Sequence, residues 1–93
     1  MADLLNDEAI MARLDGLAWE REGEEIVRDR TFKDFAEAIA FVNRVAETAE
    51  EANHHPDILV HGWNNVRLSL TNHAAGGLTA PDFELAAAFD ELL

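Results

Sequence analysis

Four histidines are the side chains of this sequence best suited to proton transfer near neutral pH. They are His54, His55, His61 and His73, and they fall within a stretch of 20 residues. Histidine has an unperturbed pKa of about 6.5, so it gives or takes a proton near neutrality with little tuning by its surroundings. The chain has no other cluster of such groups, and this one predicts an acid/base site.

The neighbouring residues indicate how three of these rings can meet. His54 and His55 precede Pro56, which disfavours helical geometry for His55 and places the pair on a turn. His73 follows the run LSLT, which ends a predicted strand. If that strand lies beside the turn, His54, His55 and His73 surround one pocket, and we expect these three residues to be catalytic.

Other roles for the same residues have to be weighed. A single histidine is more often a surface or capping residue than a catalytic one, unless a pocket surrounds it. His55, Asp57, His61 and His73 could also offer nitrogen and oxygen ligands to a metal ion. Adjacent residues of an extended segment point in opposite directions, and the chain has no HxH or HExxH spacing that preorganises a metal site. We therefore expect no metal.

Two tryptophans and a glycine pair are weaker candidates. Trp19 and Trp63 could stack on a flat ligand, although a tryptophan at a strand end is more often partly buried in the core. The pair Gly76-Gly77 precedes a predicted helix, whose N-terminus could bind an anion. The nearby Asp82 and the lack of a neighbouring Lys or Arg favour a simple loop leading into a helix cap.

Length and composition limit the class of protein. The 93 residues contain no linker-like stretch, so residues 1–93 are predicted to form a single domain. A domain of this size has a modest core, so subunit association is a source of extra stability and an oligomer is expected. The chain has no cysteine, its first residues MADLLNDEAI do not resemble a signal peptide, and no apolar run approaches the ~20 residues of a membrane span. These features predict a cytoplasmic protein.

The charge balance restricts the partners. Seven Lys and Arg stand against nineteen Asp and Glu, a formal net charge of −12. Such a chain repels a phosphate backbone and an anionic lipid surface, so neither nucleic acid nor membrane is an expected partner. The acidity is spread over the chain and favours solubility or adaptation to salt, and a neutral small molecule is the easiest substrate to reconcile with it.

Hydrophobic periodicity and capping residues predict five segments in the order helix, hairpin, helix, hairpin, helix. A first helix over about 6–15 starts at Asn6, and a hairpin joins 19–22 to 25–32 across Gly23. Asp34 and Glu37 resemble a capping box, from which a helix continues to about 51. Strands are predicted over 58–61 and 66–71, and a last helix starts near Thr79. This order favours an α+β fold, an antiparallel sheet with helices on one face.

Two predicted helices have an apolar side that should face the sheet. For the long helix these residues are Phe35, Ile39, Val42, Ala46 and Ala49. For the last helix they are Leu85, Phe89, Leu92 and Leu93.

Several of these residues together resemble the pterin-4α-carbinolamine dehydratase family. The most specific part is Glu50, three further residues, and His54-His55-Pro56. It is followed by a strand ending in His73 and by the helix start Gly-Gly-Leu-Thr with Asp82. The resemblance covers nearly the whole chain, including Trp19. One departure is the stretch DILVHGW after Pro56, which is one residue longer than in many relatives and has Trp63 near their usual tyrosine.

The resemblance implies a four-stranded antiparallel sheet with three helices packed on one face, assembled into dimers or tetramers. It implies dehydration of 4a-hydroxytetrahydropterin to quinonoid dihydropterin, in support of tetrahydropterin recycling, with no metal and no organic cofactor. The catalytic residues would be His54, His55 and His73. Substrate-binding or supporting roles would fall to Glu50, Asn53, Pro56, Trp19 and Asp82.

A mechanism follows from the chemistry of this reaction. Loss of the 4a-hydroxyl requires one group that gives a proton to the leaving oxygen and one that takes a proton from N5. We expect His54 and His73 to be this pair, His55 to position the ring, and Glu50 to orient an imidazole. Two alternatives are a non-catalytic dimerisation or assembly partner with the same fold, and a metal-dependent hydrolase.

Overall fold

The computed structural model describes residues 3–93, which form three α-helices and four β-strands. In chain order these are α1 (Asp7–Leu14), β1 (Glu20–Glu22), β2 (Glu25–Thr31), α2 (Phe35–Ala52), β3 (Asp57–His61), β4 (Asn65–Leu70) and α3 (Ala80–Asp90). The predicted α+β class and the order α-β-β-α-β-β-α are confirmed. The predicted domain starts at residue 1, and its first two residues lie outside the described part. None of the helices within 3–93 combines the length and the apolar character needed to cross a membrane.

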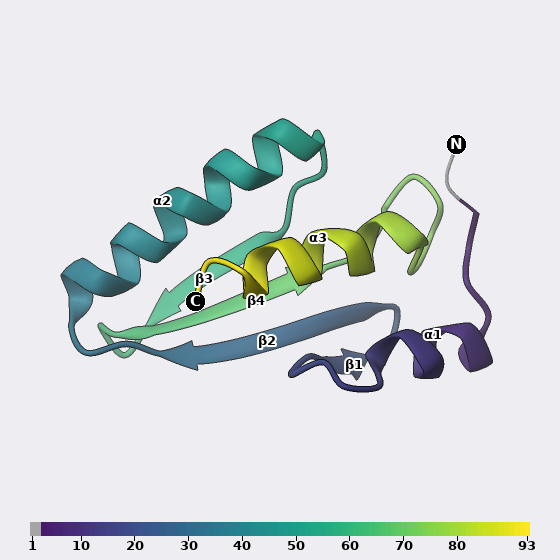
Figure 1. Ribbon diagram of the computed structural model, residues 1–93, viewed down its shortest axis with the longest axis horizontal. Helices are drawn as coiled ribbons and strands as arrows, with labels where there is room; N and C mark the ends of the chain where they lie inside the picture. The colour runs from purple at the N-terminus through teal and green to yellow at the C-terminus, as the bar shows by residue number, and fades with distance from the viewer. Residues whose placement is uncertain (1–2) are drawn as a thin grey trace.

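The four strands form one antiparallel sheet in the order β1-β2-β4-β3. Two hairpins, β1–β2 and β3–β4, are joined side by side through β2 and β4, which pair from Ile26 opposite Leu70 to Thr31 opposite Asn65. Helices α2 and α3 lie across one face of this sheet, and α1 lies beside β1 (Figure 1). The edges of the sheet are therefore β1 and β3.

The predicted caps and turn explain where the first elements begin and end. The Asn6 side chain accepts a hydrogen bond from the Ala9 N–H at 2.8 Å and starts α1. The Asp34 side chain accepts from the Glu37 N–H at 2.8 Å and starts α2. Gly23 turns β1 into β2 with φ of +62°, a left-handed conformation that glycine adopts at little cost.

The helix-facing side of the sheet and the inner sides of the helices form one apolar core. Its buried members include Ile10 of α1, Ile26 of β2, Val66, Leu68 and Leu70 of β4, Ala38, Phe41, Val45 and Ala49 of α2, and Phe83, Leu85, Ala86 and Phe89 of α3. Phe41 packs against Phe32, with ring centroids 5.0 Å apart.

The predicted inner side of α2 is wrong for two of its residues. Phe35 is 54% exposed and Ala46 is also exposed, whereas Phe41 and Val45 are buried. The apolar arc of this helix is wide enough to contain two overlapping stripes with the same spacing. Periodicity cannot tell which of them faces the sheet, because that depends on how the helix is rotated against it.

The last helix matches its predicted inner face only in part. Leu85 and Phe89 are buried, and Leu92 packs partly buried against the core. Leu93 is 41% exposed, so its predicted place in the core is wrong. The reason is that α3 ends at Asp90, and the residues beyond it no longer follow the helical periodicity.

Ion pairs cross the sheet face that carries no helix. Arg67 of β4 is paired with Asp29 of β2 at 3.3 Å and with Glu22 of β1. The hydrogen bond to Glu22 and the charge of Asp29 raise the pKa of Arg67 above its ordinary value. This arginine therefore stays charged and links three neighbouring strands on the exposed face.

Trp19 belongs to the core at the C-terminal end of α3. It is only 4% exposed, and its indole Nε1–H donates to Asp90 Oδ1 at 2.9 Å. The same oxygen accepts from Arg28 Nη1 at 3.1 Å. Asp90 thus ties the segment before β1 and the strand β2 to the end of α3.

Replacing Asp90 should destabilise the fold. Asp90→Ala leaves the indole N–H of Trp19 buried without an acceptor, which costs about 1–3 kcal/mol. The free energy of unfolding from urea denaturation, followed by circular dichroism, should fall by this amount. Glu91→Ala removes an exposed carboxylate one residue later and should change it by less than about 0.5 kcal/mol. An equal effect of the two substitutions would contradict this role of Asp90.

Candidate active site

The end of α2 determines where the histidine doublet lies. Asn53 adopts a left-handed conformation, with φ of 51° and ψ of 39°. Its N–H donates to the Glu50 carbonyl at 3.1 Å, and the His54 N–H donates to the Ala49 carbonyl at 3.2 Å. This pair of bonds is the Schellman ending of a helix, in which asparagine is one of the few residues other than glycine that tolerate the left-handed position. The predicted supporting residue Asn53 therefore has a structural role, because it turns the chain so that the doublet leaves the helix.

His54 is held by a buried carboxylate from another element. Its Nε2 lies 2.5 Å from Asp82 Oδ1, although the two residues are 28 positions apart in the chain. The Asp82 side chain is fully buried, and that of His54 is 18% exposed. The imidazole is thus fixed in orientation, with Nε2 toward Asp82 and Nδ1 left for another partner.

The Asp82 carboxylate also closes the first turn of α3. Its Oδ2 accepts from the Thr79 N–H at 2.8 Å and from the Thr79 hydroxyl at 3.0 Å. The predicted capping signal at Thr79 and Asp82 is confirmed. Because both oxygens are hydrogen-bonded, burial of this carboxylate is compensated, and the start of α3 becomes a rigid support for His54.

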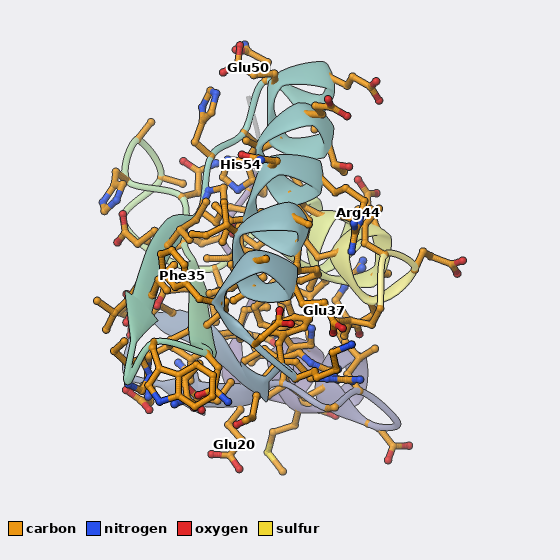
Figure 2. All side chains as sticks on the ribbon, turned by 90° about the vertical axis from the view of Figure 1, so that its left-hand side faces the viewer. Glu20, Phe35, Glu37, Arg44, Glu50 and His54 are labelled. Carbon is orange, nitrogen blue, oxygen red and sulfur yellow. The ribbon has the colours of Figure 1, made fainter. Side chains whose placement is uncertain are left out.

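His55 is paired with a second, exposed carboxylate. Its Nε2 lies 2.7 Å from Glu50 Oε1, and the two side chains are 57% and 77% exposed. Figure 2 shows Glu50 at the C-terminal end of α2. Glu50, expected to hold an imidazole from one helical turn before His54, contacts His55, and its role in the site stays a prediction. A contact this exposed contributes little to stability, so His55 is held far less firmly than His54.

His73 lies at the same end of the sheet as the doublet. β3 begins at Asp57, two residues after His55, and Asp57 is paired with Ser69, close to the end of β4. His73 follows β4 by three residues. Among the described residues, however, His73 has no hydrogen bond or ion pair with His54 or His55.

The loop that carries His73 is closed on itself. The Asn72 N–H donates to the Gly77 carbonyl at 3.0 Å, and the Asn72 side chain accepts from the Ala75 N–H at 3.0 Å. A Cβ atom on Gly77 would lie 2.7 Å from the Glu24 carboxylate, so the loop passes close to the β1–β2 turn. The loop and the turn enclose a hollow of about 390 Å³, lined by His73 together with Glu22, Glu24, Glu25, Thr71, Asn72, Gly76 and Gly77.

A second hollow adjoins His54. It measures about 560 Å³ and lies between the end of α2 and the start of α3. Its walls are Thr48, Glu51, Ala52, Pro81, Glu84, Leu85 and Ala88 besides His54. Pockets of this volume hold small organic ligands. The three predicted catalytic residues thus lie at one end of the sheet, but His54 lines one hollow and His73 lines the other, and His55 is in the lining of neither.

The other predicted residues lie elsewhere. Trp19 is a core residue bonded to Asp90, eight residues or about 12 Å along α3 from Asp82. His61 ends β3, about 13 Å from Asp57 at its start, so the metal ligands considered from the sequence are spread along the strand. Within residues 3–93, no group of three or more His, Asp or Glu side chains is placed to hold a metal ion. Roles of Trp19 and Pro56 toward a substrate stay predictions.

The pairing of His54 with Asp82 was not anticipated from the sequence. The capping motif identified Asp82 as the residue that closes α3, but no spacing rule connects it to a histidine 28 residues earlier. No spacing rule connects Glu50 to His55 either, because these two residues are five positions apart. A continuous helix brings together residues three or four apart, and only the left-handed turn at Asn53 brings these two into contact.

Comparison with known proteins agrees with this arrangement. Residues 3–92 match the model of the family described as "Pterin 4 alpha carbinolamine dehydratase". A protein of Roseiflexus castenholzii is 52% identical over 94 aligned residues covering the whole of both chains, and its name proposes that it is a pterin-4-alpha-carbinolamine dehydratase. The crystal structure of a transcriptional coactivator/pterin dehydratase from Brucella melitensis superposes with a TM-score of 0.90 at 28% identity, covering 97% of this chain and 98% of that one.

A more distant structure belongs to a protein with a different role. It is a pterin dehydratase-like protein identified as a RuBisCO assembly factor in the alpha-carboxysome, with a TM-score of 0.68 and 25% identity over 83% of this chain and 90% of that one. Fold and site define an α+β domain with histidine–carboxylate pairs at one end of its sheet. The chain belongs to the pterin-4α-carbinolamine dehydratase family.

The contact with Asp82 predicts the tautomer of His54. A carboxylate only accepts hydrogen bonds, so neutral His54 should carry its proton on Nε2 and leave Nδ1 bare. The nitrogen chemical shifts of the imidazoles, from two-dimensional ¹⁵N–¹H NMR, distinguish the two tautomers. In Asp82→Asn the side-chain amide can donate as well as accept, and the preference should weaken. A neutral His54 ring with its proton on Nδ1 and a bare Nε2 in the unmodified protein would disprove the contact.

Proposed function

We propose that this protein is a hydro-lyase that dehydrates 4a-hydroxytetrahydropterin to quinonoid dihydropterin. The observation that carries the proposal is the His54–Asp82 pair in a member of this family. A partly buried imidazole held by a buried carboxylate at the edge of a hollow of ligand size is the arrangement that acid/base catalysis needs. The product would support the recycling of tetrahydropterin.

The reaction requires two proton transfers. The bond between C4a and the hydroxyl oxygen breaks, the oxygen takes up a proton, and water leaves. N5 loses its proton, and its electrons form the double bond between N5 and C4a. The enzyme therefore has to present one protonated and one unprotonated group to the same ring.

We assign these two roles to His54 and His73. With Nε2 of His54 turned toward Asp82, its Nδ1 is the atom free to exchange a proton with substrate. His73 follows β4 at the same end of the sheet and would act from the side of the β4–α3 loop. His55, held by Glu50, would position the pterin ring. A ring bound across this end would reach from one hollow toward the other.

The remaining properties are consistent with a small neutral substrate. The net charge of −12 disfavours nucleic acid, and a neutral pterin bears no anionic group that this charge would repel. A dimer or tetramer and a cytoplasmic location stay predictions from the sequence.

Removing either proton-transfer group should slow turnover. His54→Ala and His73→Ala should each lower kcat by about 10²-fold or more, because general acid–base groups contribute typically 10²–10⁴-fold. Turnover is measured with freshly generated 4a-hydroxytetrahydropterin in a coupled assay. Arg44→Ala, on the exposed side of α2, is the control and should leave kcat unchanged (Figure 2). Wild-type rates in both histidine variants would refute the assignment.

The pH dependence offers an independent check. A pair with opposite protonation states gives a bell-shaped profile of kcat/KM against pH, falling on the acid side as the base is protonated and on the alkaline side as the acid loses its proton. In His54→Ala one limb of the bell should disappear. A profile that is flat across neutrality in the wild-type enzyme would indicate that no histidine pair is at work.

The assembly role described for one structural neighbour is the competing function. Loss of the histidine motif would favour such a role, whereas this chain has the doublet, His73 and both carboxylate partners. The dehydration assay separates the two, because an assembly protein gives no turnover above the uncatalysed rate.

A further inference from the structure

The loop between β4 and α3 connects the two proposed proton-transfer groups. It carries His73, three residues after the end of β4, and it ends at Thr79, the cap residue of α3. Asp82, which holds His54, lies in the first turn of that helix. The distance between the rings of His54 and His73 therefore depends on how this loop is attached to the rest of the molecule.

The second half of the loop is firmly attached. Gly77, Leu78 and Thr79 are all buried. The Leu5 N–H donates to the Leu78 carbonyl at 2.9 Å. Leu4 forms an isolated antiparallel bridge with Thr79, and Figure 1 shows the N-terminal segment running beside the loop. This half of the loop cannot move without disturbing the buried start of α3.

The first half of the loop is attached to the sheet by one side chain. The backbone pairing of β2 with β4 ends where Ile26 lies opposite Leu70, so Thr71 lies just beyond the paired residues. Its hydroxyl donates to the Glu24 carbonyl, in the turn between β1 and β2, at 2.6 Å. Within residues 3–93 no other hydrogen bond joins residues 71–76 to this turn. The Thr71 hydroxyl thus continues the attachment of β4 to its neighbour after the backbone ladder has stopped.

Residues 72–77 are bonded to each other between these two attachments. The N–H groups of Gly76 and Gly77 both donate to the Asn72 carbonyl, at 2.9 and 3.2 Å. The exposed His73 lies inside this closed turn, and among the described residues its ring has no hydrogen-bond partner. Since the turn is closed on Asn72, a displacement of Thr71 is passed on to His73 two residues later and is not absorbed by the loop.

We propose that Thr71 is a positioning residue for His73. By bonding to the Glu24 carbonyl, its hydroxyl determines where the ring of His73 lies relative to the ring of His54. Thr71 itself exchanges no proton with the substrate and acts only through His73. The catalytic part of this inference rests on the proposed function, whereas the attachment of the loop by Thr71 does not.

The hydroxyl also joins the two walls of the hollow beside His73. The loop forms one wall and the β1–β2 turn forms the other, and a Cβ atom on Gly77 would lie 2.7 Å from the Glu24 carboxylate. A group that transfers a proton has to lie within about 2.6–3.2 Å of the atom it serves. A misplacement of about 1 Å can lower a rate by about 10²-fold. One hydrogen bond that shifts the loop therefore affects turnover far more than it affects folding.

The proposal is tested by Thr71→Val, which keeps the branched shape of the side chain and removes the hydroxyl. The value of kcat should fall about tenfold, because His73 is displaced, while KM should change by less than about twofold. Thr71→Ser keeps the hydroxyl and should restore kcat to within about twofold of the wild-type value. No loss in Thr71→Val, or an equal loss in Thr71→Ser, would overturn the proposal.

The chain offers a matched control at the opposite end of the same two strands. The Thr31 hydroxyl donates to Asn65 Oδ1 at 2.6 Å, where β2 and β4 begin their pairing at the other end. Thr31→Val therefore removes a bond of the same kind and length and should leave kcat unchanged. An equal loss of kcat in Thr31→Val and Thr71→Val would mean that turnover responds to any weakening of the sheet.

A double substitution separates positioning from a general loss of structure. If Thr71 acts only through His73, its hydroxyl has no effect once the ring is absent, so Thr71→Val combined with His73→Ala should have the kcat of His73→Ala alone. A further tenfold loss in the double variant would contradict the proposal. The bell-shaped pH profile should keep both limbs in Thr71→Val, whereas His73→Ala should lack one.

The attachment of the loop is tested without turnover by crystal structures of the variants. Residues 71–76 should lie farther from the β1–β2 turn in Thr71→Val than in the wild-type protein, and at the wild-type distance in Thr71→Ser and Thr31→Val. An unmoved loop in Thr71→Val would show that the hydroxyl does not hold it. If the wild-type protein shows no dehydration, the proposed function fails, while the crystal structures still decide whether Thr71 attaches the loop.

Discussion

The carboxylate of Asp82 is the contact on which the site depends. It is fully buried, closes the first turn of α3 through Thr79, and holds His54 from the segment after α2. A buried carboxylate lacking these hydrogen bonds would be costly, so the start of α3 and the end of α2 are fixed relative to each other. The orientation of His54 is therefore a property of how the helices pack on the sheet. Its own loop does not determine it.

The two carboxylate–histidine pairs differ because their burial differs. Asp82 and His54 are shielded from water, which strengthens their interaction, whereas Glu50 and His55 are more than half exposed. One imidazole is thus rigid and the other free to adjust. Proton transfer benefits from the first property, and contact with a ligand of variable position benefits from the second.

The doublet and His73 lie at one end of the sheet, but the sheet does not enclose them. Antiparallel pairing brings the start of β3 beside the end of β4, so the doublet and His73 must lie at the same edge. A chain of this size has few residues left to build walls, and the hollows at this end are shallow depressions between neighbouring elements.

The sequence by itself determined the local structure of this protein. Asn6, Asp34 and the Thr79–Asp82 capping box set the starts of the helices, Gly23 set the first turn, and alternation identified β4, because each of these signals acts over a few residues. It also identified the histidine doublet and the family. Only the tertiary structure decided that Phe41 and not Phe35 faces the sheet, that Asp82 holds His54, and that Trp63 is exposed while Trp19 is buried. These outcomes depend on helix rotation and strand register between residues far apart in the chain, which periodicity and spacing do not encode.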